Sequence, residues 1–175
     1  MNTRRRKALA GGLLASIMAA VFCAAPIGAQ DKDKLDLDKI PKKVMDALKA
    51  KFPNPEITKW TKEKEGADEV FDIEFKLKGR KYEADIKEDG TIVNYEKEIA
   101  IKDLPKAVTR AVEAKYPKST VKEVMEMTDV MGKNEKLHGY EITLETADRK
   151  SIEVTVAPDG KILEDSGAAK KTEKQ

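Results

Sequence analysis

The sequence is poor in the residues from which most enzyme and metal sites are built. Its 175 residues include one cysteine, one histidine and one tryptophan. The cysteine, Cys23, lies in an apolar N-terminal run, so the rest of the chain has no thiol for a disulfide bond or a metal site. The serines beyond that run stand in no nucleophile-elbow context, and no glycine-rich phosphate loop is present. We therefore predict a protein without catalytic residues, metal ions or cofactors.

Two polar features are weak candidates for a site. His138 has no second histidine or thiol with which to bind a transition metal, and such a lone histidine is typical of a protein surface. Asp85, Glu88 and Asp89 offer the oxygen atoms that calcium prefers, but they lack the order of ligands and glycine of an EF-hand. We interpret both features as solvated polar groups.

The first 29 residues have the order of a secretory signal peptide. A positive segment, Arg4 to Lys7, precedes an uncharged apolar run, Ala8 to Cys23, and small residues follow as far as Ala29. The apolar run is shorter than the roughly 20 residues that a membrane-spanning helix needs. We predict Sec-type export to the periplasm or the medium, cleavage near Ala29, and no stable membrane span afterwards. An uncleaved anchor, lipid attachment at Cys23 and twin-arginine export are the alternatives.

The charge pattern argues against nucleic-acid binding. Four of the 34 basic residues lie in the predicted signal peptide and none of the 32 acidic ones do, so the remainder has 30 basic and 32 acidic residues and a formal charge of −2. Both signs are interspersed along this remainder. No broad basic field is therefore available for phosphates.

The remainder of the chain reads as two copies of one pattern. The offset between corresponding residues is 64 at the start and 70 at the end, because one loop of the second copy is longer. The order of prolines, aromatic residues and Asp-Gly pairs is preserved, which indicates an internal duplication. The corresponding segments are Ile40-Pro41 with Leu104-Pro105, Phe52-Pro53 with Tyr116-Pro117, Phe71 to Phe75 with Tyr140 to Leu144, and Asp89-Gly90 with Asp159-Gly160.

Each copy predicts one helix and four strands. In the first copy, Val44 and Leu48 follow a helical spacing between Pro41 and Pro53, which favour the start and the end of a helix. Residues 71–77 and 82–87 alternate between apolar and polar side chains, as half-buried strands do. A weaker strand around 57–61 precedes them, and the Asp-Gly turn leads into a short last strand.

The predicted fold class is α+β: tandem α-β-β-β-β modules, with an antiparallel sheet and the helices packed on one face. Modules lying side by side would form a longer sheet with an open polar face. The predicted organisation is a signal peptide at 1–29, a charged leader at 30–38, a first repeat at 39–103, a second repeat at 104–166 and a disordered tail at 167–175.

This pattern resembles the PepSY-like family, in particular the group described as putative β-lactamase-inhibitor-like. The resemblance rests on Leu104-Pro105 and Tyr116-Pro117 around the helix, Tyr140-Glu141-Ile142 in a strand and Asp159-Gly160 in a turn, with their counterparts in the first copy. It covers nearly all of the chain after the signal peptide. It implies a twisted antiparallel sheet, an extracytoplasmic setting and non-catalytic binding, which in some relatives is inhibition of a secreted enzyme.

Trp60 is the candidate binding residue. If Ile57 faces the helices, strict alternation places Trp60 on the open side of the sheet, where an exposed tryptophan is a common interface anchor. The alternative is that Trp60 covers a sheet edge or the junction between the modules. The same parity assigns Met125 and Met127 to the buried face as core residues, with a binding surface or a soft-metal site as the alternative.

The leading hypothesis is an exported, non-enzymatic binding module with a protein partner in the cell envelope, acting as an inhibitor or regulator of an envelope or secreted enzyme. The alternative is a periplasmic small-ligand or envelope-stress sensor, with its pocket between the modules or on the open face. An undetected hydrolase is disfavoured because general acid–base sites need partner groups that this chain lacks.

Overall fold

Each repeat begins with a proline that fixes the start of a helix. The computed structural model, which describes residues 35–66 and 68–167, has α1 at Lys42–Lys51 and α2 at Lys106–Lys115, directly after Pro41 and Pro105. Proline has a preset φ and lacks the N–H that the first turn of a helix leaves unpaired, so it suits this position. A short 3-10 turn precedes each helix: η1 at Leu37–Lys39 and η2 at Ile101–Asp103.

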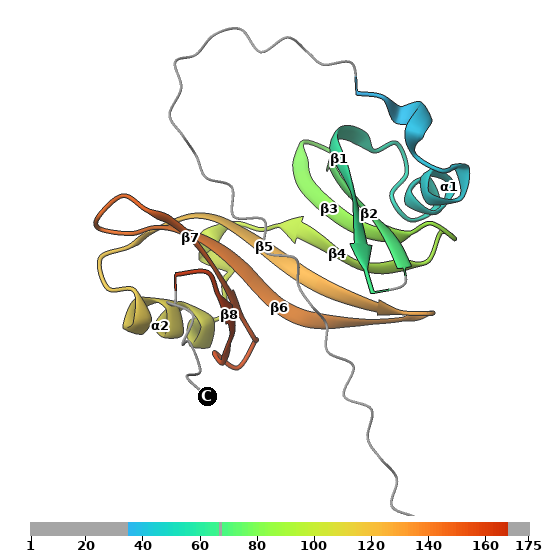
Figure 1. The fold of residues 1–175 in the computed structure, drawn as a ribbon. Coiled ribbons are helices and arrows are strands. Elements are labelled where there is room, and N and C mark those ends of the chain that lie inside the picture. The colour runs from blue at the N-terminus through green and yellow to red at the C-terminus, as the bar shows by residue number, and fades with distance from the viewer. Residues whose placement is uncertain (1–34, 67, 168–175) are drawn as a thin grey trace, which may run out of the picture.

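Eight antiparallel strands follow one another across a single sheet in chain order (Figure 1). Strands β1 to β4 follow α1 and strands β5 to β8 follow α2, so the predicted tandem α-β-β-β-β arrangement is confirmed. The strands are β1 Glu56–Glu65, β2 Asp68–Leu77, β3 Arg80–Lys87, β4 Ile92–Glu98, β5 Thr120–Met131, β6 Asn134–Glu145, β7 Ser151–Val156 and β8 Ile162–Asp165.

Both helices cover the same face of the sheet, and each has its own buried cluster beneath it. Leu48 of α1 packs with Phe71 and Ile73, while Val112 of α2 packs with Ile142. Figure 1 shows the sheet twisting between the modules, so that α1 and α2 lie at opposite ends of the molecule. One row of paired residues links the clusters on the helix side, with the ion pair Lys97–Glu126 (2.8 Å) at its middle: Phe75, Tyr82, Lys97, Glu126, Tyr140 and Val156.

The two predicted Asp-Gly turns dock against the helices in the same way. Gly90 and Gly160 both have φ near +91°, a conformation that glycine adopts without strain. A Cβ atom at Gly90 would lie 2.9 Å from the carbonyl oxygen of Lys43, and one at Gly160 would lie 2.8 Å from that of Ala107. Each turn therefore needs glycine both for its backbone and for its close approach to the first turn of the helix.

A β-bulge interrupts the first strand of each module at the same place. The pairing shifts by one residue between Ile57 and Lys59 in β1, and between Val121 and Glu123 in β5. An extra residue in one strand reverses the side-chain alternation beyond it. Strict alternation, on which the sequence-based assignment of faces in these strands relied, therefore fails in both modules.

The longer loop of the second copy is an extension of the β5–β6 hairpin, residues 128–137, and it reaches the first module. At its tip the carboxylate of Glu135 accepts hydrogen bonds from Nζ of Lys51 (2.5 Å) and from the hydroxyl of Tyr95 (2.8 Å). The Nζ atom of Lys51 also lies 4.5 Å from the centre of the Tyr95 ring. The hairpin extension thus connects the second module to α1 and β4.

Several predictions concern residues outside the described ranges. The signal peptide at 1–29, most of the charged leader at 30–38 and all but the first residue of the tail at 167–175 lie there. Within 35–66 and 68–167, neither helix has the length and apolar character to cross a bilayer.

The cores give a direct test of the fold. Leu48→Ala and Ile142→Ala should each lower the free energy of unfolding by about 2–5 kcal/mol, because both side chains are fully buried and their loss leaves a cavity. His138→Ala should change it by about 1 kcal/mol or less, since the ring is partly exposed and contacts one carboxylate. Chemical denaturation measures all three variants, and equal midpoints would show that the buried faces are misassigned.

Candidate functional site

The face of the sheet opposite the helices carries mainly carboxylates. We call it the open face. Side chains on this face alternate with the buried core residues, and their positions follow from the register of the strand pairs. Its acidic residues in the centre of the sheet are Asp72, Glu74, Glu83, Asp85, Glu96, Glu98, Glu123, Glu141 and Glu153.

Three glutamates of the open face have strongly raised pKa values. Burial, followed by the negative charge of Asp72, raises the pKa of Glu83 to about 9. Burial also raises the pKa of Glu96 to about 8 and that of Glu141 to about 7, with further contributions from neighbouring carboxylates. Glu83 and Glu96 are directly paired across β3 and β4, which brings two like charges together. At neutral pH, part of this face is therefore protonated.

Lys81 is the cation at the centre of the open face. Its Nζ atom lies 3.2 Å from a carboxylate oxygen of Glu123 on β5. Burial lowers the pKa of Lys81, but the charge of Glu123 and its hydrogen bond outweigh burial and raise it overall. The positive charge of Lys81 also acts to lower the pKa values of Glu141 on β6 and Glu153 on β7.

Two methionines of β5 lie on the open face and not beneath the helices. The predicted face is wrong for both, because the bulge at Lys122 separates them from Val121, whereas the predicted burial is confirmed for Met125. Met125 pairs with Glu141 and is buried, while Met127 pairs with Glu96 and is partly exposed. They supply apolar surface in the middle of the carboxylates.

Trp60 lies on the helix side of the sheet, so the prediction that it faces the open side is wrong. The bulge after Ile57 reverses the alternation, and Trp60 pairs with the fully buried Ile73. Its ring stacks on Phe71 with 6.2 Å between centroids, and it packs against the first core cluster. The ring is partly exposed, and a role for Trp60 in binding stays a prediction.

His138 lies on β6 and contacts Asp129 of the neighbouring strand β5. Its Nδ1 atom lies 3.0 Å from a carboxylate oxygen of Asp129. Within the described part of the chain, no three His, Cys, Asp or Glu side chains are grouped so that they could hold one metal ion.

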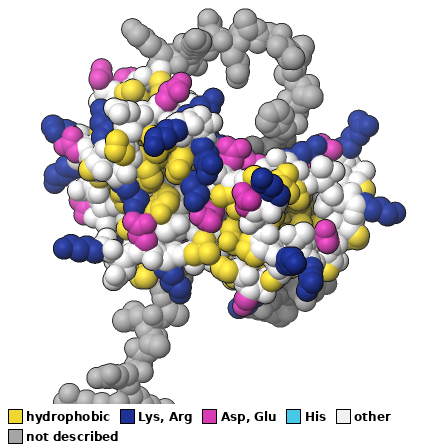
Figure 2. Space-filling model, turned by 180° about the vertical axis from the view of Figure 1, so that it is seen from behind, with side chains coloured by type: hydrophobic (Ala, Val, Ile, Leu, Met, Phe, Trp, Pro, Cys, Tyr) yellow, Lys and Arg dark blue, Asp and Glu magenta, His cyan; other side chains and the backbone are white. Residues whose placement is uncertain are grey.

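The surface seen in Figure 2 carries both signs of charge. Lysine and arginine side chains mix with aspartate and glutamate over both lobes, and hydrophobic side chains gather in patches between them. This view agrees with the interspersed charges of the sequence.

Comparison with known families gives one match that spans most of the chain. The family model described as "Putative beta-lactamase-inhibitor-like, PepSY-like" matches residues 29–93 and again residues 70–164. The predicted resemblance and its two copies are therefore confirmed. Comparison with curated proteins gives no match.

Solved structures from Bacteroides species share the fold. A "putative periplasmic" protein of Bacteroides eggerthii superposes with a TM-score of 0.54 at 18% identity, covering 71% of this chain and 86% of its own. A DUF2874 family protein of Bacteroides uniformis gives a TM-score of 0.53 at 18% identity, covering 71% and 87%. A BLIP-like protein of Bacteroides fragilis has 23% identity and a TM-score of 0.49, covering 75% and 91%. At these identities the likeness concerns the fold alone.

The raised pKa values predict that stability falls as pH rises. A carboxyl group whose pKa is higher in the folded than in the unfolded state binds more protons when folded. For Glu83, the free energy of unfolding therefore falls as pH rises from about 4.5 to about 9, because the folded state resists ionisation of this group. Glu83→Gln removes that penalty. Between pH 5 and pH 9 the free energy of unfolding of the variant should fall by at least about 1.4 kcal/mol less than that of the wild type, the equivalent of one pKa unit. Urea denaturation at both pH values measures this, with the exposed Glu88→Gln as the control; parallel declines would contradict it.

The corrected position of Trp60 predicts a structural effect. Trp60→Ala should lower the free energy of unfolding by about 2–4 kcal/mol, because it removes the stack on Phe71 and contacts with the first core. Lys64→Ala, an exposed position on the same strand, is the matched control and should change stability by less than about 0.5 kcal/mol. Thermal denaturation followed by circular dichroism compares the two. Indistinguishable midpoints would place Trp60 outside the core.

Proposed function

Because the chain belongs to the putative β-lactamase-inhibitor-like, PepSY-like family, we propose that it is an exported, non-enzymatic binding module whose partner is a protein of the cell envelope. The family description supports binding and not catalysis. The signal-peptide pattern of residues 1–29 and the "putative periplasmic" description of the Bacteroides eggerthii structure support a periplasmic or secreted location. Inhibition or regulation of an envelope or secreted enzyme is the role that we assign to this binding.

The open face is the surface that we assign to the partner. The observation that carries this assignment is a sheet of eight strands whose two helices lie on one side, which leaves the opposite side uncovered across both modules. Interfaces of stable complexes bury about 800 Å² on each partner, and an eight-stranded face offers an area of this order. Met127, which is partly exposed, provides an adaptable apolar contact near its centre.

The charge of the open face indicates a partner that presents lysine or arginine. Carboxylates outnumber the cations that contact them, Lys59 and Lys81, and several of them are kept protonated by burial and by one another. A cation placed among them lowers their pKa values and favours the ionised form. Binding of a basic segment would then release protons, so the affinity should rise as pH rises from about 6 to about 8.

The second candidate function is a small-ligand or envelope-stress sensor. One observation favours it, namely a cavity in the second module between α2 and β5. This cavity lies on the helix side and not between the modules or on the open face, where such a site was expected.

Capture of partners with paired charge variants tests the proposed function. The bait is the chain without the predicted signal peptide, applied to envelope extract of the native host. Glu141→Gln with Glu153→Gln removes two carboxyls from the open face, whereas Asp46→Asn with Glu88→Gln removes two from exposed positions on α1 and a turn. A protein retained by the wild type and the control pair, and weakened at least tenfold by the open-face pair, is the expected result.

Two outcomes contradict the proposal in different ways. Equal retention by both variant pairs would place the binding surface elsewhere on the molecule. Failure of the folded wild type to enrich any envelope protein would favour the sensor function. Circular dichroism of each bait verifies that the variants are folded.

A further inference from the structure

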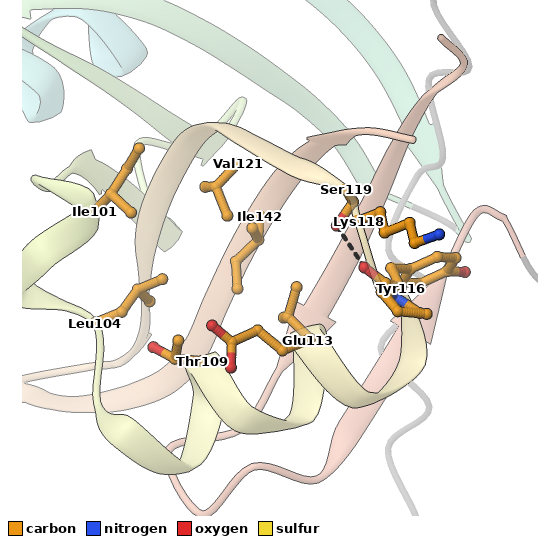
Figure 3. Close-up of a pocket in the computed structure, with 11 residues that line it drawn as sticks. Ile101, Leu104, Thr109, Glu113, Tyr116, Lys118, Ser119, Val121 and Ile142 are labelled. Carbon is orange, nitrogen blue, oxygen red and sulfur yellow. Dashed lines mark hydrogen bonds between the residues drawn. The ribbon is translucent and has the colours of Figure 1, made fainter. Parts of the chain in front are cut away.

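An apolar cavity of about 230 Å³ lies between α2, η2 and the start of β5 (Figure 3). Figure 3 shows Leu104, Val121 and Ile142 around its interior, with Thr109 and Glu113 of α2 along one side. A second hollow of about 380 Å³ adjoins it, because Ile101, Leu104 and Thr109 line both. The second hollow opens among the side chains of Lys102, Lys106 and Arg110.

The duplication explains why a cavity forms here. Met45 packs against the core of the first module, and its counterpart in the second module, Thr109, is much smaller and lines the cavity. At two more positions the side chain of the second module is also smaller than that of the first. Leu48 corresponds to Val112 and Ile57 to Val121, and both of these valines line the cavity. Smaller side chains at corresponding positions of the same fold leave unfilled volume.

The charges around the cavity also differ between the modules. Lys102 and Arg110 stand where the first module has Asp38 and Asp46, and Lys118 stands where it has Asn54. In the first module Lys42 forms an ion pair with Asp46 (2.5 Å), whereas its counterpart Lys106 takes part in none of the ion pairs among the described residues.

Cations therefore predominate at the mouth of the two hollows. Lys102, Lys106, Arg110 and Lys118 are all exposed, and none of them pairs with a carboxylate within the described part of the chain. Glu113 is the one carboxylate among the residues that line the hollows. An apolar interior with a cationic mouth suits a molecule that has an apolar chain and a negative end.

We propose that the second module binds a fatty-acid carboxylate, with its acyl chain between α2 and β5 and its carboxylate among Lys102, Lys106 and Arg110. The volume sets the chain length. At about 30 Å³ for each water-sized group, 230 Å³ holds roughly eight carbon atoms. This site shares no residue with the open face, so it stands or falls independently of the proposed protein-binding function.

A series of ligands tests the size and the charge of the site. Hexanoate, octanoate, decanoate and the neutral octanol are titrated into the purified chain below their micelle concentrations, and amide chemical shifts are followed by NMR. The affinity should rise roughly fourfold for each methylene group, as burial of such groups predicts, and level off near eight to ten carbons. Octanol should bind about threefold to tenfold more weakly than octanoate, because it lacks the interaction with exposed cations.

Variants locate the site. Thr109→Met introduces the residue of the first module and fills the cavity, so it should weaken octanoate binding at least tenfold, while Thr109→Ser should keep it within about twofold. Lys106→Gln with Arg110→Gln should weaken octanoate threefold to tenfold and leave octanol unchanged. Lys42→Gln with Lys43→Gln, on α1, removes the same charge and should change neither. Thermal midpoints within a few degrees of the wild type verify that each variant is folded.

Two further experiments test whether a membrane lipid or a second copy of the chain occupies the cavity instead. Sedimentation with vesicles of anionic phosphatidylglycerol or neutral phosphatidylcholine separates free fatty acid from a membrane lipid, and retention by anionic vesicles without octanoate binding would overturn the proposal. Ultracentrifugation of the ligand-free wild type and Thr109→Met tests a second copy as the occupant, which a dimer lost in the variant would establish instead. Absence of saturable octanoate binding, or equal binding by Thr109→Met, also overturns it.

Discussion

The pairing of β4 with β5 is the interaction on which the rest of the molecule depends. Each module has its own buried cluster, and the two clusters have no residue in common. A module of roughly 60 residues buries too little surface to be robust alone, and an unpaired β4 or β5 would expose a free strand edge. Five residue pairs, from Asn94 with Asp129 to Glu98 with Met125, close that edge and make one sheet.

The same pairing determines the electrostatics of the open face. Glu96 lies on β4 of the first module, and the negative charge of Glu141 on β6 of the second module helps to raise its pKa. The carboxylates that raise the pKa of Glu83 all belong to the first module. In a separate first module, β4 would be an edge strand exposed to water, and the pKa of Glu96 would lie closer to its ordinary value. The joined sheet instead keeps Glu96 near Glu141 and partly out of water. The chemistry of that face thus depends in part on the tandem arrangement.

Much of this fold could be predicted from sequence because the residues that start and end its helices and form its turns act locally. Proline, helical spacing and Asp-Gly turns act within a few residues, and they fixed both helices and the last hairpin of each module correctly. The family resemblance could be predicted for the same reason, since it rests on these prolines and Asp-Gly turns and on the aromatic residues between them.

The faces of β1 and β5 could not be derived from alternation because a bulge changes it. One signal was present: Ile57 and Trp60 are three residues apart, as are Val121 and Val124, in strands that otherwise alternate. An apolar pair at that spacing in both copies is what a bulge requires, since both side chains then reach the same core. The raised pKa values depend on strand order, which brings together residues that are far apart in sequence.

Strand β5 separates the two proposed sites, and its bulge defines both of them. Val121, before the bulge, lines the cavity on the helix side, whereas Glu123 and Met125, after it, belong to the open face. Because no side chain contributes to both sites, binding at one should be additive with binding at the other unless β5 itself moves. Neighbouring strands hold β5 on both edges, with β4 on one side and β6 on the other. A shift of the strand would break pairs in both modules at once, so the pairing that joins the modules also keeps the two faces independent.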